Sequence, residues 1–530
     1  MKARILFILP VLFMAGMFIT CNAPKRTPIV RTTLKAGDEV DLEKTLTINV
    51  ARRGSIRDLT LENMFSKYLQ DRFNVILNIT DIAPSDYITR MNLMFAAGET
   101  DDLSLAHRPD FMLSNWIEAG YLLGFTQEQV EKLLPNFISH YTPEAWPVVW
   151  DNISYTDGLT YYFPGRRAQY MNMAWLYRED IFNKYGLTFP DTTDELFDVL
   201  MKLKEETGMY PIVECDPQSS MWAFTGYLQA FGMPELALRD ISMIDPITGD
   251  FEPFIFTTDN YRRFISFLNK LYKNDLMWPE FATGTHEQRN SLQARGHRFI
   301  MWGFPEQIAT QLNEISRTGN QDANWKWAPV MITEDTAKGH FYKRDPYFAA
   351  DGIGFSVDAT DEVVERFLYI LNWLYSEEGL IFATYGLEGV HFERQGSDFV
   401  FLPHMATPLT PVGHKLENFG FIPALVPSHH NLNDYYRPYI AELQNTFINR
   451  ENYYFHTAPI LRFTERESTE LADIQTILAQ TREEYSARFV MGHLDVNDDA
   501  VWDSYVRTMN QLGLQKLKDI RNAAYGRKNR

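Results

Sequence analysis

The opening of the globular sequence constrains the fold most, because it alternates between the periodicity of strands and that of helices. Apolar and polar residues alternate over 46–50, which is typical of a strand. Apolar residues then recur at helical spacing over 61–69, and strict alternation returns over 75–79. A strand, a helix and a second strand joined this closely predict a parallel strand pair with a crossover helix.

The same alternation of elements recurs along the chain. Thr192 and Glu195 have the spacing of a capping box, and they precede an amphipathic helix that we expect to end near Gly208. Further strands are expected at 102–106, 211–214, 298–303 and 325–330, and further helices at 86–97, 364–379, 469–489 and 500–525. We therefore predict an α/β fold of two lobes, each with a mostly parallel sheet, whose ligand would lie at the carboxyl ends of strands.

The segment Met1–Cys21 has the pattern of an export signal. After a short basic start, residues 5–20 carry no charge, a run that is short for a membrane-spanning helix and typical of a signal peptide. Cys21 follows at once, as in bacterial lipoproteins that are acylated at this cysteine, although Phe18 and Thr20 depart from the residues usual before it. The alternatives are an uncleaved anchor helix and a plain secretory signal. Under each interpretation the body is exported, and we expect it to be lipid-anchored to the cell membrane, facing the periplasm or the exterior.

Residues 21–44 lack hydrophobic periodicity and are rich in Pro, Thr and Lys. This composition favours an extended, mobile linker over a packed element. We therefore expect a signal peptide over 1–20, a flexible tether over 21–44 and a globular body from residue 45 onward.

The charge balance limits the partners of this body. The chain has 50 Lys and Arg against 69 Asp and Glu, a formal net charge of −19, which argues against nucleic acid and against anionic membrane surfaces. Its 2 cysteines are Cys21 and Cys215, so acylation of Cys21 would leave no disulfide, and we expect Cys215 to be a small buried hydrophobe. The 27 Tyr and 11 Trp provide ample material for surfaces that stack on sugars.

Four segments, in order along the chain, resemble one bacterial family. They are Leu93–Asp102, Trp175–Thr192, Trp373–Val390 and Glu470–Tyr525. Their order and spacing resemble the extracellular solute-binding proteins of ABC importers, family 1, of the lipoprotein type and the oligosaccharide class. The resemblance runs from about Thr45 to Arg527 and so covers almost the whole mature chain.

The resemblance implies a two-lobed, periplasmic-binding-protein-like (Venus flytrap) fold with a ligand cleft between the lobes. Lobe one would contain 45–170 and a returning segment at about 342–393, and lobe two would contain 171–341 and 394–530. The implied partners are an oligosaccharide or other small-molecule ligand and the ABC permease subunits, with the binding protein itself a monomer. Relatives that bind acidic oligosaccharides carry a calcium loop where Lys204–Tyr210 stands, and this segment lacks its alternating Asp and Asn, so we expect no metal and no cofactor.

Sugar sites combine flat aromatic rings with planar hydrogen-bonding side chains. The resemblance implies that Trp302, in an expected strand end, is a cleft tryptophan. The other candidates follow expected strand ends or lie near the crossings between lobes. They are Trp222, Arg52, Arg53, Tyr347, Phe348, Asp351, His107, Arg108, Tyr161, Tyr162 and Arg166. For each of them the alternative is an ordinary role in the core or on the solvated surface.

The sequence contains no recognisable catalytic motif. It has no G-x-S-x-G elbow and no Walker-type glycine loop, and His286-Glu287 lacks the second histidine that a zinc site would need. We therefore expect that the protein is not an enzyme. We expect instead that it captures a sugar by hinge closure and delivers it to a permease. The main rival hypothesis is a secreted lipoprotein glycoside hydrolase, which would place two carboxylates across a cleft. A surface adhesin on the same scaffold is a further hypothesis, and a binding protein of this class could also take a peptide as its ligand.

Overall fold

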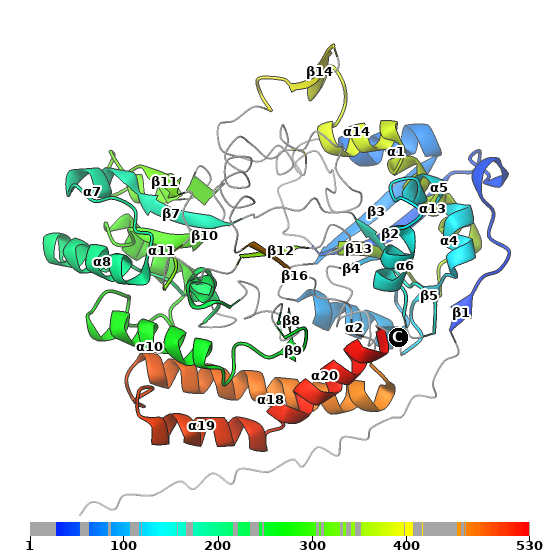
Figure 1. Ribbon diagram of the computed structural model, residues 1–530. Helices are drawn as coiled ribbons and strands as arrows, with labels where there is room; N and C mark the ends of the chain where they lie inside the picture. The colour runs from blue at the N-terminus through cyan, green and yellow to red at the C-terminus, as the bar shows by residue number, and fades with distance from the viewer. Residues whose placement is uncertain are drawn as a thin grey trace, which may run out of the picture.

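The computed structural model describes most of the chain from residue 28 onward. The described residues are 28–53, 63–82, 86–106, 116–117, 119–155, 157–165, 173–215, 221–233, 243–245, 248–303, 307–308, 312–328, 332–334, 341–344, 351–396, 398–405, 416, 453–456, 461 and 463–528. They form two α/β lobes, which lie on the right and on the left of Figure 1.

A five-stranded mixed sheet forms the centre of lobe one, in the order β3-β2-β4-β13-β6. Its strands are β2 (Leu46–Arg53), β3 (Val75–Ile82), β4 (Leu103–Ala106), β6 (Phe163–Gly165) and β13 (Asp351–Phe355). The strands β3, β2 and β4 are parallel, as expected from the strand–helix–strand opening, whereas β13 runs antiparallel to both β4 and β6. A segment from far along the chain therefore completes the sheet.

Helices cover this sheet and share one apolar core with it. They are α1 (Met64–Phe73), α2 (Tyr87–Ala97), α4 (Gln127–Leu133), α5 (Pro135–Ile138), α6 (Trp146–Ile153), α13 (Asp361–Leu374) and α14 (Glu377–Tyr385). The helix expected over 364–379 ends earlier, at Leu374, because the Ser376 side chain accepts a hydrogen bond from Gly379 N and caps the new helix α14. Gly98 ends α2 in the left-handed conformation, as expected.

Lobe two is built around a three-stranded sheet in the order β10-β7-β11. Its strands are β7 (Ala174–Arg178), β10 (Ile300–Gly303) and β11 (Trp325–Ala328), and the prediction of a mostly parallel sheet is wrong here, since both pairs are antiparallel. The strand expected at 211–214 is reduced to one parallel bridge between Ile212 and Met277. The surrounding elements are α7 (Glu179–Lys184), α8 (Thr193–Thr207), η2 (Trp222–Phe224), α9 (Thr225–Leu228), η3 (Gln229–Phe231), β8 (Met243–Ile244), β9 (Phe251–Glu252), α10 (Asp259–Lys273), α11 (His286–Ala294) and α12 (Asn313–Arg317).

The predicted capping box of α8 is confirmed. The Thr192 side chain accepts a hydrogen bond from Glu195 N at 3.2 Å, and Glu195 accepts one in return from Thr192 N at 3.1 Å. Gly208 ends the helix with φ +67°. Cys215 is buried among Val213, Trp278 and Leu292, as expected of a small hydrophobe.

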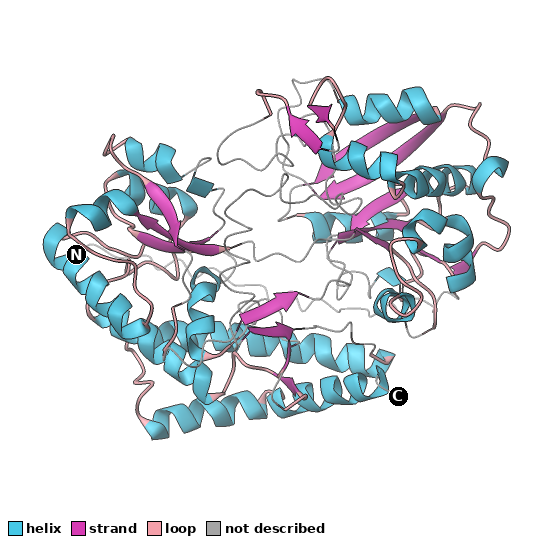
Figure 2. Ribbon diagram, turned by 45° about the horizontal axis from the view of Figure 1, so that its top comes forward, coloured by secondary structure: helices cyan, strands magenta, loops and turns pink. Residues whose placement is uncertain are grey.

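Three C-terminal helices lie together along lobe two in both views (Figures 1 and 2). They are α18 (Glu465–Val490), α19 (Asp499–Gln511) and α20 (Leu514–Lys528), and α18 packs on α10. The single helix expected over 500–525 is broken, because the chain turns at Gly513 with φ +105°. In the described part of the chain, no helix has both the length and the apolar character needed to cross a membrane.

A separate parallel pair, β12 (Phe341–Arg344) and β16 (Tyr453–His456), lies between the two lobes in Figure 1.

Two predicted boundaries differ from the structure. Residues 394–405 were expected in lobe two, but the hairpin of β14 (Phe392–Gln395) and β15 (Asp398–Phe401) packs on lobe one, where Phe399 stacks on Tyr385 at 4.7 Å between ring centroids. Met405 and Leu416 also belong to the core of lobe one.

The N-terminal boundary differs too. Residues 28–44 are not the flexible tether expected across 21–44. β1 (Ile29–Val30) pairs in parallel with β5 (Leu123–Gly124), and the Leu34 and Val40 side chains are buried.

Candidate functional site

Arg52 and Asp81 lie opposite each other near the carboxyl ends of the parallel strands β2 and β3. Arg52 Nε donates to Asp81 Oδ1 at 2.6 Å and Nη2 donates to Oδ2 at 2.9 Å, a bidentate pair. The two side chains are 18% and 15% exposed. Arg52 Nη1 takes no part in this pair. The pair therefore presents a fixed, planar and nearly neutral polar group at an edge of the sheet where ligands of α/β folds bind.

Tyr162 lies inside lobe one, beneath β13. Its ring is 1% exposed, and a Cβ placed on Gly352 would lie 2.4 Å from Tyr162 Cδ2, so only glycine fits at that position. The neighbouring Tyr161 is buried as well and donates to Asp157 Oδ2 at 2.5 Å; burial and this carboxylate raise the pKa of its hydroxyl. A ligand could reach the Tyr162 ring only after a change of packing around β13.

Trp302 lies in β10, directly opposite Trp175 of β7. The two indole rings are 5.3 Å apart between centroids and meet edge to face, and Trp302 is 6% exposed. The Trp302 ring rests on Gly226 of α9, where a Cβ would lie 2.3 Å from Trp302 Cγ. Trp222 begins the short helix η2 that leads into α9, so these two tryptophan candidates come from neighbouring elements of lobe two.

The remaining candidates lie wholly or partly outside the described residues. His107, Arg108, Arg166, Tyr347 and Phe348 are outside them altogether. For Arg53, at the end of β2, and Asp351, at the start of β13, the backbone is described but the side chain is not, and the same holds for Trp222. These residues stay predictions.

A buried polar network in lobe two was not anticipated from the sequence. Arg298 donates through Nε and Nη2 to the two carboxylate oxygens of Glu214, at 2.9 and 3.0 Å, and through Nη1 to Gln293 Oε1 at 2.9 Å. Arg298 has φ +71° and directly precedes the segment that enters β10. The network therefore fixes the strand that carries Trp302. An arginine just before the apolar run 299–302 was the available signal.

Tyr227 lies at the centre of the same lobe. Its ring meets Trp175 edge to face at 4.9 Å between centroids, and its buried hydroxyl has no hydrogen-bond partner among the described residues. Burial, together with the charge of Glu214, raises the pKa of this hydroxyl. Tyr227 therefore remains a neutral support for the tryptophan pair.

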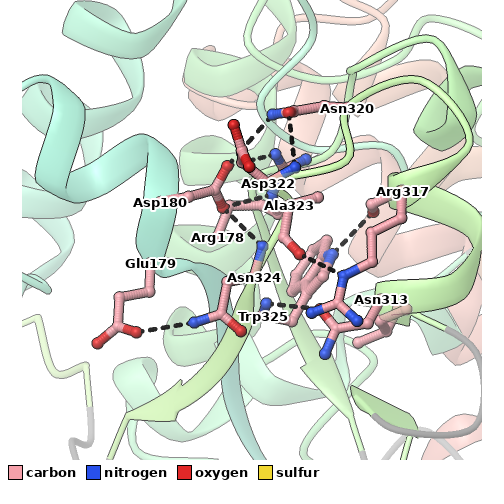
Figure 3. Close-up of polar contacts among 12 residues, drawn as sticks. Arg178, Glu179, Asp180, Asn313, Arg317, Asn320, Asp322, Ala323, Asn324 and Trp325 are labelled. Atoms are coloured by element: carbon pink, nitrogen blue, oxygen red, sulfur yellow. Dashed lines mark hydrogen bonds and ion pairs between the residues drawn. The ribbon is translucent and has the colours of Figure 1, made fainter.

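A second polar network holds the opposite end of β7, where Arg178 pairs with Trp325 of β11 (Figure 3). Arg178 donates two hydrogen bonds to Asp180, at 2.8 and 2.6 Å, and Asn324 N donates to the same carboxylate at 3.1 Å. Burial raises the pKa of Asp180, but the bonds from Arg178 and Asn324 outweigh it and hold that pKa below its usual value. Because these groups satisfy one another at the strand end away from Trp302, they anchor α7 to the sheet.

The segment Lys204–Tyr210 carries a cation of its own. Lys204 forms an ion pair with Asp275, and its ammonium lies 4.4 Å from the centroid of the Tyr210 ring. Among the described residues, no group of three or more His, Cys, Asp and Glu side chains has an arrangement that could hold a metal ion. That no cofactor or metal is needed stays a prediction.

Comparisons with known proteins identify the family. A family model described as bacterial extracellular solute-binding protein matches residues 63–381. The fructooligosaccharide ABC transporter substrate-binding protein FusA of Streptococcus pneumoniae is 22% identical over 487 residues, which cover 83% of this chain and 82% of FusA.

Solved structures show the same fold. The alginate-binding protein AlgQ2, solved without calcium, superposes with a TM-score of 0.72 at 19% identity, over 91% of this chain and 98% of AlgQ2. FusA of S. pneumoniae in complex with kestose superposes with a TM-score of 0.69 at 17% identity, over 92% of this chain and 99% of FusA. Both matches extend over nearly the whole length of each chain. This two-lobed α/β chain belongs to the bacterial extracellular solute-binding proteins.

Proposed function

We propose that this protein is the lipid-anchored substrate-binding component of an ABC importer for an oligosaccharide or substituted sugar. The family match carries the proposal, together with the end-to-end likeness to FusA, whose structure holds kestose. Cys21 would carry the lipid, and permease subunits would receive the ligand. The protein would act as a monomer, outside the cytoplasm, without chemistry of its own.

Two separate apolar cores support a mechanism of hinge closure. One core collects residues from Leu34 to Phe163 and from Ile353 to Leu416, and the other collects residues from Trp175 to Ile332 and from Leu471 to Ile520. Each lobe can therefore move as a unit without loss of its own packing. We propose lobe one as about 45–170 with 342–393 and the hairpin after it, and lobe two as 171–341 with the C-terminal helices.

We place the ligand between the carboxyl ends of β2 and β3 and the Trp302 side of lobe two. Arg52 would donate hydrogen bonds to sugar hydroxyls through Nη1, with Asp81 holding its guanidinium plane. Closure would be driven only by contacts that are better in the closed form. Micromolar affinity, about 8 kcal/mol, is within reach of a few such contacts.

The test is a thermal-shift screen against saccharides, with peptides as the matched control class. A ligand at about 100 times its Kd stabilises the folded state by about 2.7 kcal/mol, which a melting curve detects readily. We expect stabilisation by oligosaccharides and contraction of the molecule in small-angle scattering. Stabilisation by peptides alone would overturn the sugar assignment, and saccharide products in chromatography would support the hydrolase hypothesis instead.

Substitutions then test the proposed site. Trp302→Phe should weaken the binding of a confirmed saccharide, whereas Trp278→Phe should not. Trp278 is the matched control, because it is an equally buried tryptophan of lobe two in a different apolar cluster. Equal affinities of the two variants would remove Trp302 from the site.

A further inference from the structure

We infer that residues 28–44 form a strap that fastens the lipid-anchored N-terminus to lobe one alone. Lobe one is then held at the lipid surface, and lobe two lies farther from the membrane. This inference rests on the proposed acylation of Cys21. It adds to the proposed function an orientation of the body toward the membrane.

The start of the strap is bound by both backbone and side chain. Ile29 and Val30 pair with β5, and the carbonyl of Arg31 accepts a hydrogen bond from Gln129 Nε2 at 2.7 Å. Arg31 Nη1 forms an ion pair with Asp361 at 2.8 Å, and Nη2 donates to two backbone carbonyls just before α13, those of residues 357 and 359, at 2.8 and 2.5 Å. Since its side chain is only 17% exposed, these charge-assisted bonds are partly shielded from water.

The end of the strap is bound to the same helix. Arg366 of α13 is 1% exposed and donates to the carbonyl oxygens of Asp41 and Lys44 in the strap and of Phe73 at the end of α1. Glu365 accepts a hydrogen bond from Lys35 N at 2.9 Å. A buried guanidinium that satisfies carbonyls of the strap would lose its partners if the strap left, which makes release costly.

All hydrogen bonds and ion pairs that join the strap to the rest of the described chain go to lobe one. Through the backbone of β1 it pairs with Leu123 and Gly124 of β5. Its other partners there are Asn74, Gln129, Val357, Ala359, Asp361, Glu362, Glu365 and Arg366. In Figure 1, β1 lies on the outer side of lobe one near α4, whereas α8 lies on the far side of lobe two. The attachment is thus one-sided.

The strap shortens the reach of the anchor. Seven Cα steps separate Cys21 from Pro28, which at full extension span about 25 Å. A free linker from Cys21 to Thr45 would span up to about 80 Å, enough for the body to present any face to the membrane. The shorter reach keeps the β1 side of lobe one near the headgroups.

The experiment measures energy transfer to the membrane from a donor on each lobe. The full-length acylated protein, with Cys215→Ala as background, is placed in phosphatidylcholine vesicles that contain an acceptor-labelled headgroup. A donor is attached at Glu128→Cys in α4 or at Glu205→Cys in α8, two exposed positions on the two lobes. We expect the lobe-one donor to transfer at least twice as efficiently as the lobe-two donor. Equal transfer from an acylated protein would overturn the inference.

Release of the strap supplies the second readout. Arg31→Gln should reduce the difference in transfer efficiency between the lobe-one donor and the lobe-two donor. It should also speed tryptic cleavage after Lys35 at least tenfold. Arg72→Gln is the matched control, because Arg72 forms an ion pair on lobe one, with Glu378, without touching the strap. Unchanged cleavage in Arg31→Gln would refute the strap.

None of these readouts needs a ligand, so their outcome does not depend on whether the protein binds a sugar. Radiolabelled palmitate tests Cys21 itself. Absence of the label would overturn the proposed anchor together with this inference, whereas acylation with equal donor transfer would overturn the inference alone.

Discussion

Gly226 lies beneath the Trp302 ring and makes its position possible. A Cβ at residue 226 would lie 2.3 Å from Trp302 Cγ, 2.5 Å from Cβ and 2.6 Å from Cδ2. Carbon atoms in contact prefer separations of about 3.5–4.0 Å. The substitution Gly226→Ala therefore forces α9 away from β10, because turning the indole ring would not move Trp302 Cβ.

Two opposing effects determine how much Gly226→Ala changes the free energy of unfolding. Alanine in place of glycine favours a helix by up to about 1 kcal/mol, and overpacking a core costs about 1–3 kcal/mol. The atoms that overlap belong to the start of the Trp302 side chain and not to a flexible end, so relief needs backbone movement. We therefore expect a net loss of about 1–2 kcal/mol in the free energy of unfolding.

Urea unfolding followed by circular dichroism measures this loss. Gly526→Ala is the control, because Gly526 lies in α20 with nothing within 4 Å of a new Cβ, and it should leave the protein as stable or slightly more stable. In the double variant Gly226→Ala/Trp302→Ala the two losses should not add, with a coupling of about 0.5–3 kcal/mol. Wild-type stability of Gly226→Ala, or strict additivity, would refute the packing of Trp302 on α9.

Three further outcomes are expected. Glu214→Gln should cost about 3–5 kcal/mol in urea unfolding, because it leaves Arg298 buried without its counter-charge, whereas the exposed Glu362→Gln should cost no more than about 1 kcal/mol. Burial lowers the pKa of His391 from 6.5 to about 4, so the folded state binds fewer protons than the unfolded one between these values. Stability should fall by about 1–2 kcal/mol from pH 7 to pH 5, and a pH-independent difference between wild type and His391→Gln would contradict this. Thr192→Ala should lower stability by about 0.5–2 kcal/mol through loss of the α8 capping box; an unchanged urea midpoint would show that the cap contributes nothing.

Local signals in the sequence predicted local structure well. The Thr192–Glu195 capping box, the left-handed Gly98 and the alternation in β2 and β3 each act within a few residues. Strand direction in lobe two was not predictable in this way. An apolar run such as 299–302 reads the same whether its partner runs parallel or antiparallel, and that partner, β7, lies more than a hundred residues earlier.

Non-local contacts explain the other differences. The strap has the composition of a linker, yet Arg31 finds its carbonyl and carboxylate partners more than 320 residues away. The candidate site also depends on contacts between residues that are far apart in the sequence. Nothing in the sequence around Arg52 shows that Asp81 will engage its guanidinium, because only the register of β2 and β3 brings the two together.

The polar candidate Arg52 and the aromatic candidate Trp302 differ in how much the protein must rearrange before a ligand can contact them. Arg52 is already held by Asp81, so a sugar hydroxyl could bind Nη1 with little reorganisation. Trp302 is 6% exposed, and full stacking on a sugar would require its ring to leave the core. Exposing the 150–250 Å² of an aromatic side chain costs about 4–6 kcal/mol, which is half or more of the roughly 8 kcal/mol that micromolar binding supplies. In the proposed site Trp302 would therefore meet a ligand through its exposed edge, and we expect Trp302→Phe to weaken saccharide binding by about tenfold at most.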